Sequence, residues 1–249
     1  MRTRGLLRAL SEELFGASVP LNSFPCLKSL RGLGTSDSES YAAMLREKFD
    51  YTNTQFHRAP KFDISAPGVG ESGSYDFLIS SEVFEHVVPP VEAAFQNAWR
   101  LLKPNGVMIF SAPYSLEATT VEHFPDLHEH TVAKLGEQMV LVNRTREGQV
   151  QVFENLIFHG GQGATLEIRE FSEAGLRNLF TEAGFKSVRI FGEDYAPFGI
   201  VRNEKCSLPF AARKGEFSFT RENAAEMIEN WQRLLQRKWI RLGDKLGVV

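Results

Sequence analysis

Two continuous apolar runs, separated by an amphipathic segment, most constrain the fold of this 249-residue chain. Residues 75–80 read YDFLIS and residues 107–114 read VMIFSAPY, without the alternation of a half-exposed strand. Strands of this kind are buried on both faces, as in parallel sheets covered by helices. Residues 91–102 between them predict a helix with one apolar side, made of Val91, Ala94, Phe95, Ala98 and Leu102. We therefore expect a β-α-β crossover in an α/β fold.

The same alternation of strands and helices continues on both sides of this unit. Upstream, residues 26–31 predict a strand and residues 36–49 a helix, followed by two short β-prone pieces around 50–54 and 61–64. Downstream, a helix, a strand, a last strand and a terminal helix over 221–242 are expected. The prediction is a doubly wound, Rossmann-like, mostly parallel sheet of about seven strands. One domain is expected over residues 1–214, with a helical appendage over residues 215–249.

Residues 115–170 break this rhythm. LEATTVEHFPDLHEH, residues 116–130, predicts a long polar loop rich in histidine. Residues 139–159 predict a β-hairpin, because two β-rich arms flank Arg-Glu-Gly. We therefore expect an insertion, a loop followed by a hairpin, over about residues 115–165.

The composition argues against several partners. The formal net charge is −3 and no long basic run occurs, so no nucleic acid is expected as a partner. No uncharged stretch approaches 18 apolar residues, so no membrane span is expected. The first 16 residues predict an amphipathic helix rather than a signal peptide. With only two cysteines, Cys26 and Cys206, the expected location is cytoplasmic. The basic residues of the terminal helix leave a homodimer or a membrane-surface role open beside a solvated face.

The segment RGLGTS, residues 31–36, is the first candidate for a ligand site. A strand that runs into Gly-x-Gly and then a helix can bring its backbone close to a nucleotide-like ligand. Gly32 and Gly34 would then remove Cβ atoms that collide with that ligand. The alternative is a glycine turn between strand and helix.

The following strand ends also carry polar side chains. Asn53 and Thr54 lie about 20 residues on, where ribose hydroxyls are bound, although they can equally form a turn. Asp63 can accept from an exocyclic amine and Ile64 can pack on a base, the alternative being a solvent-facing carboxylate. The fourth strand ends in Ser80, Ser81 and Glu82. Because ligands bind at the carboxyl ends of parallel strands, these positions predict a nucleoside site.

Three segments resemble class I S-adenosylmethionine-dependent methyltransferases, in the type 11-like group that methylates small molecules. They are YDFLISSEVFEHV (75–87), NAWRLLKPNGVMIFSAPY (97–114) and FSEAGLRNLFTEAGFKSVRI (171–190). The resemblance implies methyl transfer to a small-molecule acceptor, with S-adenosylmethionine as the cofactor. It also assigns cofactor-binding positions: Gly32 and Gly34 to the methionine part, Asn53 and Thr54 to the ribose, Asp63 to the adenine amine, and Ser80 and Ser81 to the strand end beside the cofactor. Glu85 and His86 match the pair that follows, with His86 facing the cofactor or the acceptor.

Three departures from that family keep two alternatives open. Leu30 stands where an acid is common, Ser36 replaces the third glycine, and an amide or hydroxyl replaces the ribose acid. A noncatalytic nucleoside-binding or scaffold protein on the same fold is the first alternative. A nicotinamide-dependent oxidoreductase is the second, and it is disfavoured because the third glycine of the dinucleotide pattern is missing.

Methyl transfer to a hydroxyl needs a base, and histidine titrates near working pH. The catalytic candidates are His86, His123 and His128, and the acceptor-binding candidates are Tyr114, His130 and His159. His159, beside three glycines, has a structural turn as its alternative. Methyltransferases that this sequence resembles suggest a sugar or saccharide hydroxyl as the acceptor, in polysaccharide biosynthesis.

A metal site in the histidine-rich loop is not predicted. His123, Asp126, His128 and His130 have the spacing H-x-x-D-x-H-x-H, which matches no specific ligand pattern. We expect this loop to be a polar lid over the acceptor.

Overall fold

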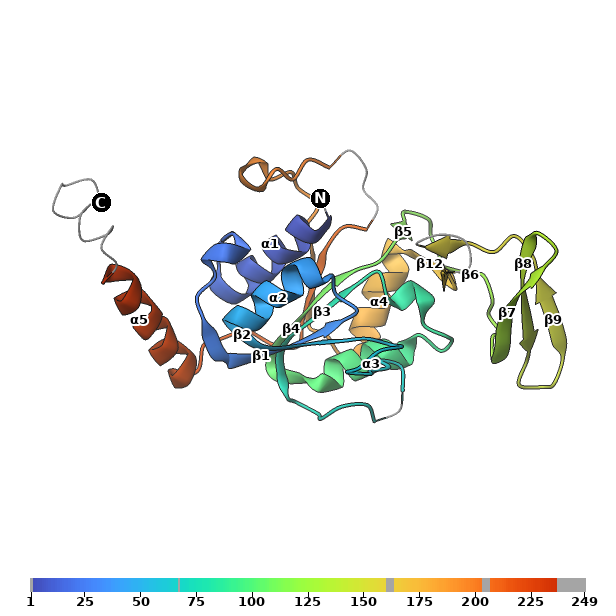
Figure 1. The fold of residues 1–249 in the computed structure, drawn as a ribbon, viewed down its shortest axis with the longest axis horizontal. Helices are drawn as coiled ribbons and strands as arrows, with labels where there is room; N and C mark the ends of the chain where they lie inside the picture. The colour runs from blue at the N-terminus through green and yellow to red at the C-terminus, as the bar shows by residue number, and fades with distance from the viewer. Residues whose placement is uncertain (1, 67, 160–163, 203–206, 237–249) are drawn as a thin grey trace.

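The computed structural model describes residues 2–66, 68–159, 164–202 and 207–236 (Figure 1). At its centre lies a six-stranded sheet in the order β13-β14-β4-β3-β1-β2. Strands β2, β1, β3 and β4 run parallel, and β14 is antiparallel to both of its neighbours. The strands are β1 (Leu27–Thr35), β2 (Phe49–Thr54), β3 (Tyr75–Ser81), β4 (Leu102–Ser111), β13 (Ser187–Ile190) and β14 (Phe210–Arg213). The predicted α/β class with a mostly parallel, doubly wound sheet is confirmed.

The predicted seventh strand is absent from the described part of the sheet. The β-prone stretch at residues 61–64 makes only one bridge, between Gln55 and Lys61. The backbone N–H of Gln55 donates to Pro60 and that of Phe62 donates to Gln55, so residues 56–60 form a closed loop. The loop thus uses the backbone N–H and C=O groups of Gln55 that a longer strand pairing with residues 61–64 would need.

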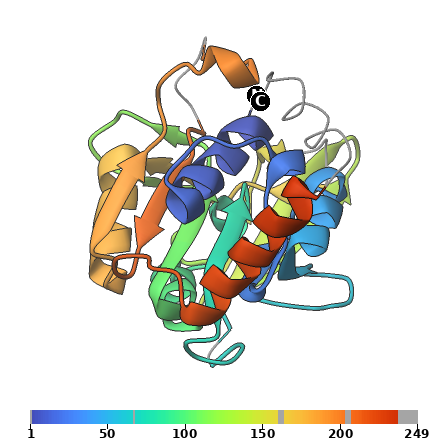
Figure 2. The same ribbon diagram turned by 90° about the vertical axis from the view of Figure 1, so that its left-hand side faces the viewer.

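Helices cover both faces of the sheet (Figure 2). One face carries α1 (Arg2–Phe15), α2 (Glu39–Lys48) and α5 (Arg221–Leu235), and the other carries α3 (Glu92–Leu101) and α4 (Glu173–Ala183). Helix α1 forms the predicted apolar stripe, because the buried side chains recur every three or four residues: Leu6, Ala9, Leu10 and Leu14. Helix α4 begins at Ser172, whose hydroxyl accepts from the Gly175 N–H, and ends at Gly184 in the left-handed conformation.

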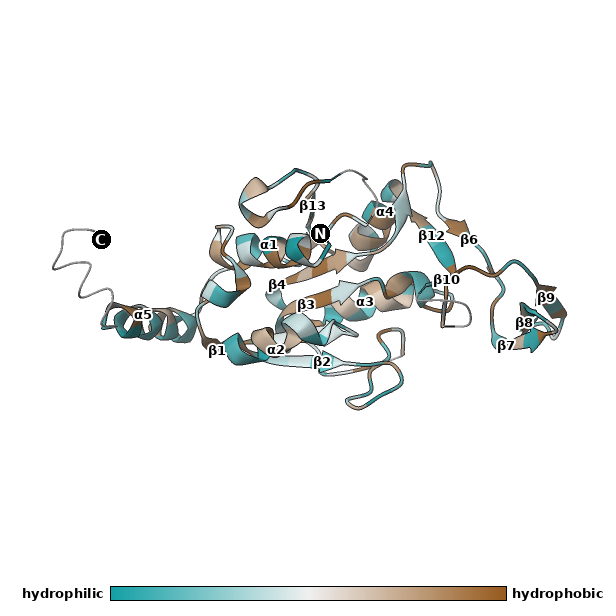
Figure 3. Ribbon diagram, turned by 45° about the horizontal axis from the view of Figure 1, so that its top comes forward, coloured by the Kyte–Doolittle hydropathy of each residue, from teal (hydrophilic) through white to brown (hydrophobic). Residues whose placement is uncertain are grey.

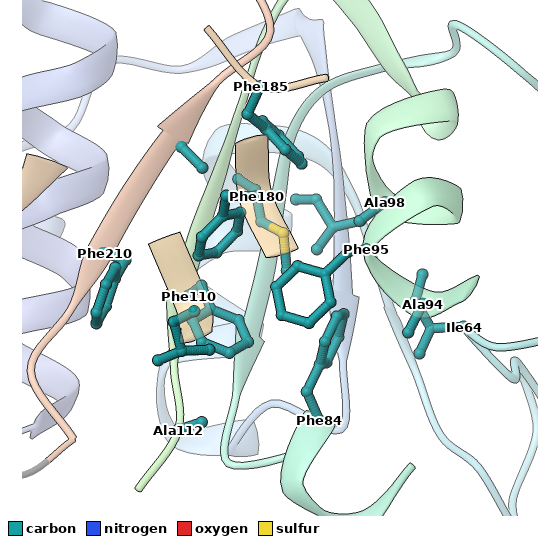
Figure 4. Packing of buried hydrophobic residues seen from close by; sticks show 14 of the residues in the cluster. Ile64, Phe84, Ala94, Phe95, Ala98, Phe110, Ala112, Phe180, Phe185 and Phe210 are labelled. Carbon is teal, nitrogen blue, oxygen red and sulfur yellow. The ribbon is translucent and has the colours of Figure 1, made fainter. Parts of the chain in front are cut away.

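Phenylalanine rings fill the core between the sheet and helices α3 and α4 (Figure 4). Phe95 of α3 packs edge-to-face on Phe84 and Phe180, and its ring centroid lies 5.8 Å from that of Phe110 in β4. The central strands β3 and β4 are accordingly largely brown, that is hydrophobic, in Figure 3. This packing fixes the direction in which β3 and β4 leave the core, toward the polar edge of the sheet.

The insertion after β4 is a set of small sheets (Figure 1). Its strands are β5 (Tyr114–Ser115), β6 (Val121–Glu122), β7 (Glu129–Leu135), β8 (Gln138–Arg144), β9 (Val150–Phe153), β10 (Phe158–His159), β11 (Thr165–Leu166) and β12 (Arg169–Ser172). The predicted hairpin is present as β8 and β9. Strand β7 was missed, since its residues were assigned to the polar loop or left unassigned. The β7-β8-β9 sheet projects away from the central sheet, whereas β10, β11 and β12 return to it.

Helix α5 is joined to β1 by polar side chains. Asn223 donates to Ser29 Oγ at 2.6 Å, and Asn230 donates to the carbonyl of Cys26 at 2.6 Å. The helix was predicted to reach residue 242, and residues 237–249 lie outside the described part, as does Cys206. The boundary at residue 214 and the homodimer stay predictions. Within the described residues, no helix combines the length and apolarity that crossing a bilayer requires.

Candidate active site

Hydroxyl side chains line the carboxyl ends of the parallel strands. In the register of the sheet, Thr35 of β1 lies beside Thr54 of β2 and Ser80 of β3. Thr35 Oγ1 donates to Ser80 Oγ at 2.8 Å, and Ser81 lies 3.0 Å from Ser111 at the end of β4. The structure therefore brings the predicted strand ends together at one edge of the sheet.

The glycine pair does not form the predicted ligand loop. Gly32 and Gly34 lie inside β1, which stays paired on both sides as far as Thr35. A Cβ at Gly32 would overlap the Phe77 ring, and one at Gly34 would overlap the Tyr51 hydroxyl and the Asp37 carboxylate. These glycines make room for the protein's own side chains, and their predicted contact with the cofactor stays a prediction.

This arrangement makes Gly34 a stability position. We expect Gly34→Ala to lower the free energy of unfolding by about 1–3 kcal/mol, because the added methyl forces Tyr51 and Asp37 apart. Gly192→Ala is the matched control, since its Cβ would meet only Leu208 at 3.4 Å. Denaturant unfolding measures both variants. Equal stabilities would show that the space at Gly34 is not filled as described.

Asn53 and Thr54 hold the turn that follows β1. Asn53 Oδ1 accepts from the Asp37 N–H at 3.0 Å, its amide donates to the Asp37 carbonyl at 2.9 Å, and Thr54 donates to the Gly34 carbonyl. The pair itself lies in β2 and forms no turn, and its predicted contact with the ribose stays a prediction. Asp37, which the sequence did not single out, is buried and accepts from the hydroxyls of Tyr41 and Tyr51. Burial raises the pKa of its carboxyl to about 7, although the two tyrosine hydroxyls oppose the shift.

Two carboxylates follow strands of the sheet, Asp63 in the segment after β2 and Glu82 directly after β3. Asp63 is partly exposed, and its Oδ1 accepts from the Ser65 N–H and hydroxyl at 2.9 and 2.6 Å. Glu82 has φ of 55° and reaches Ser111 Oγ at 3.0 Å and the Arg2 guanidinium at 3.0 Å. Together with the strand-end hydroxyls, these oxygens fit the charge and the donors of S-adenosylmethionine. Ile64 is 4% exposed and packs in the core near Ala94 (Figure 4), so it offers no broad face to a base.

A cluster of histidines and glutamates lies where the insertion returns to the end of β3. Glu85 and His86 belong to the 3-10 helix η2 (Phe84–His86), and His159 belongs to β10. His159 Nε2 lies 2.6 Å from Glu167 Oε2, and His123 Nε2 lies 3.0 Å from Glu167 Oε1. The cluster thus joins His86, His123 and His159, which are far apart in the sequence, and adds Glu85 and Glu167 as acids.

Burial changes the protonation of this cluster. The carboxyl of Glu85 is fully buried, and burial raises its pKa to about 8, with the charges of Glu82 and Glu167 adding to the shift. Burial lowers the pKa of His86, although a hydrogen bond from Nδ1 to the Leu166 carbonyl opposes the change. At neutral pH His86 is therefore a neutral imidazole.

Arg169 holds the η2 turn in place. Its side chain is fully buried and donates to the carbonyls of Phe84 and Val87 at 2.9 and 2.6 Å. The same guanidinium pairs with both oxygens of Glu122, at 2.6 and 3.1 Å. Arg169 is thus a positioning residue for Glu85 and His86. Its signal in the sequence is an arginine between the buried residues Ile168 and Phe171.

We expect Arg169→Met to lower the free energy of unfolding by about 3 kcal/mol, because it leaves two carbonyls and the Glu122 carboxylate without their donor. Chemical denaturation measures this loss. Arg177→Met is the control, since Arg177 is exposed and pairs only with Glu173 on the same helix. A loss of stability no larger than that of Arg177→Met would contradict the role of buried Arg169 in holding Glu122 and the η2 turn.

The other predicted site residues lie outside this cluster. Tyr114 is buried and packs on Phe210. His128 and His130 are exposed at the start of β7, and Asp126 is exposed as well. His123, Asp126, His128 and His130 therefore do not converge on one point. His123 instead lines a cavity of about 200 Å³ in the insertion, together with Phe124, Phe153, Glu154, Asn155, Ile157 and Glu167.

Comparison with known proteins gives the class. The family model described as a methyltransferase domain matches residues 32–190, which is more than half of the chain. The chain belongs to this methyltransferase family. It is a class I S-adenosylmethionine-dependent methyltransferase, and S-adenosylmethionine is its cofactor. The noncatalytic and nicotinamide-dependent alternatives are thereby set aside.

Solved structures of similar fold are distant in sequence. The 1,6-didemethyltoxoflavin-N1-methyltransferase of Burkholderia thailandensis is 15% identical, with 85% of this chain and 79% of that chain covered and a TM-score of 0.44. An S-adenosylmethionine-dependent methyltransferase from Clostridium acetobutylicum is 12% identical, with 83% and 97% covered and a TM-score of 0.43. The amino pentose methyltransferase CalS10 of Micromonospora echinaspora is 13% identical, with 74% and 83% covered and a TM-score of 0.41. Similarity at this level says nothing about the acceptor. No curated protein matches the sequence significantly.

Proposed function

We propose that this enzyme methylates a hydroxyl group of a sugar or saccharide. The observation that carries the proposal is the His123–Glu167 pair in the wall of the 200 Å³ cavity beside the His–Glu cluster. A hydroxyl acceptor needs a base, and this histidine has its orientation fixed by a carboxylate.

His123 is the proposed general base. Its Nε2–H donates to Glu167, which leaves Nδ1 as the basic nitrogen that accepts the proton of the acceptor hydroxyl. Glu167 then stabilises the imidazolium that forms. His86 is less suited to this role, because Nδ1 is bonded to the Leu166 carbonyl and Nε2 faces Glu85.

The lining of the cavity supports a sugar ring. Phe124 and Phe153 offer apolar faces, while Glu154, Asn155 and Glu167 offer acceptors for hydroxyls. The cavity is smaller than the pockets of about 300–1,000 Å³ that hold drug-sized ligands, which favours a single ring over an extended chain at this point.

Asp63 and Glu82 are the residues proposed to hold the cofactor, with the hydroxyl of Ser81 beside them. When bound, S-adenosylmethionine supplies a methyl group that is already activated for displacement. The protein then has to bind the acceptor and orient its hydroxyl. As part of the same proposal, the reaction occurs in the cytoplasm and contributes to polysaccharide biosynthesis. Within the part of the chain that the structure describes, Cys26 is a free thiol, which is consistent with a reducing compartment.

Incubation with methyl-labelled S-adenosylmethionine and a panel of acceptors tests the proposal. The panel contains free sugars, sugar nucleotides and oligosaccharides, with catechols and amines as matched non-sugar acceptors. We expect label in a sugar hydroxyl, located by mass spectrometry of the product. Label only in the non-sugar acceptors would contradict the proposed acceptor while leaving the methyltransferase class intact.

A further inference from the structure

Three potential metal ligands converge at the junction of η2 and β10. One ligand atom each from Glu85, His86 and His159 lies within 4.8 Å of the others. Glu85 Oε1 is 3.5 Å from His86 Nε2 and 3.7 Å from His159 Nδ1. These separations are too long for good hydrogen bonds. They match ligands that share one ion, since two ligands about 2.1 Å from a tetrahedral Zn²⁺ lie about 3.4 Å apart.

The carboxylate of Glu85 is the second, independent observation. Its side chain is 0% exposed, and neither carboxylate oxygen has a hydrogen-bond partner within the described part of the chain. A buried carboxylate without partners is costly, and buried polar groups in proteins are nearly always satisfied. A bound cation supplies the missing partner.

Both histidines are oriented by groups on their far side. His86 Nδ1 lies 2.7 Å from the Leu166 carbonyl, so it carries the proton, and Nε2 presents its lone pair toward Glu85. His159 Nε2 lies 2.6 Å from Glu167 and carries the proton. Nδ1 of His159 therefore presents its lone pair toward the carboxylate of Glu85. Metal-binding histidines typically have such a carbonyl or carboxylate behind them.

We propose that Glu85, His86 and His159 bind a divalent transition-metal ion, with Zn²⁺ as the best match. Two imidazoles and one carboxylate are a known zinc ligand set that leaves a position open. Nitrogen ligands disfavour Mg²⁺ relative to Zn²⁺. Glu85 binds the ion as the deprotonated carboxylate, and its charge together with that of Glu167 behind His159 then balances the ion. An open position would take an oxygen atom of the acceptor, a use that rests on the proposed function, whereas metal binding itself does not.

Zinc titration of the whole chain, after removal of metals with a chelator, tests the site. Competition with a chromophoric chelator gives stoichiometry and affinity, and melting with and without Zn²⁺ gives an independent readout. We expect one Zn²⁺ per chain, a higher melting temperature with Zn²⁺, and no comparable effect of Mg²⁺. Substitution by Co²⁺ should give the absorption of a four- or five-coordinate ion.

Substitutions of the proposed ligands and of Glu167 test where the ion binds. His159→Gln should bind Zn²⁺ at least 100-fold more weakly, and Glu167→Gln about 10- to 100-fold more weakly through the orientation of His159. His130→Gln, an exposed histidine of the same insertion, is the control and should bind as the wild type does. Glu85→Gln should lose the zinc-dependent rise in melting temperature. If Glu85→Gln does not fold, the other two variants decide.

Absence of zinc binding by folded wild-type protein overturns the proposal, as does equal affinity in the wild type and His159→Gln. Neither result affects the proposed acceptor, because the labelled-methyl assay measures that separately.

Discussion

Replacing His123 by glutamine is expected to lower kcat for methyl transfer by about 10²- to 10⁴-fold, the usual contribution of a general base. Glutamine keeps a donor toward Glu167 and much of the volume of the ring, but it cannot take up a proton at neutral pH. The binding of S-adenosylmethionine, measured by calorimetry, should not change, because its proposed ligands Asp63 and Glu82 follow β2 and β3, whereas His123 lies in the insertion. The KM for the acceptor should change much less than kcat.

His57→Gln is the matched control for this result. His57 is an exposed histidine outside the insertion and outside the His–Glu cluster, so its loss should leave turnover close to that of the wild type. Wild-type turnover in His123→Gln would remove His123 from the mechanism. A folded His123→Gln that loses cofactor binding as well would show instead that the residue acts on the cofactor site.

The second large effect is a pH-dependent stability that originates at Asp37. The pKa of its carboxyl is about 7 in the folded protein and near 3.8 in the unfolded chain. Between these values the folded protein keeps a proton that the unfolded chain has released. The contribution of Asp37 to stability is therefore complete below pH 4 and is lost as the pH rises to 7. A shift of about three pKa units corresponds to about 4 kcal/mol.

Asp37→Asn removes this titration. The amide keeps one acceptor and gains donors, so hydrogen bonds to the hydroxyls of Tyr41 and Tyr51 are retained. We expect the free energy of unfolding of the variant, minus that of the wild type, to rise by about 4 kcal/mol from pH 4 to pH 7.5. Urea unfolding at a series of pH values measures the difference. Asp50→Asn, an exposed carboxylate on β2, should give a flat difference. A flat difference for Asp37→Asn would contradict a raised pKa.

The parts of the fold that were predicted are those whose signal is local. The continuous apolar runs of β3 and β4, and the apolar stripe of α3 between them, identify themselves within about 40 residues. The strand ends at Ser80 and Ser81 follow from the same runs. The polar edge of the sheet was therefore available from the sequence.

The errors concern residues whose partners are distant in the chain. Gly32 and Gly34 have the pattern of a ligand loop, but the rings of Phe77 and Tyr51 occupy the space beside them. No local pattern reports which side chains fill that space. The glycine signal was correct about close approach, and the side chains that approach came only from the structure.

The histidine candidates show the same limit. The sequence offered six histidines, and the structure brings three together through Glu167 and the return of the insertion to η2. Residues 166–169 alternate apolar and charged side chains, with Glu167 and Arg169 on one face of an extended segment. A charged face inside an otherwise apolar segment is the signal that would have identified both residues.

The contacts of Arg169 with Glu122 and with the η2 turn limit which segments of the insertion can be exchanged. We call Arg169 and Glu122 the clamp residues. One guanidinium links β6 and β12 of the insertion to the turn that carries Glu85 and His86. Exchanging residues 124–158 for a shorter or longer segment keeps Glu122, Arg169, His123, His159 and Glu167 in place, whereas a cut outside Glu122 or Arg169 separates the two clamp residues. New acceptor preferences should therefore arise by grafting between His123 and His159, and chimeras joined elsewhere should lose the turn along with the graft.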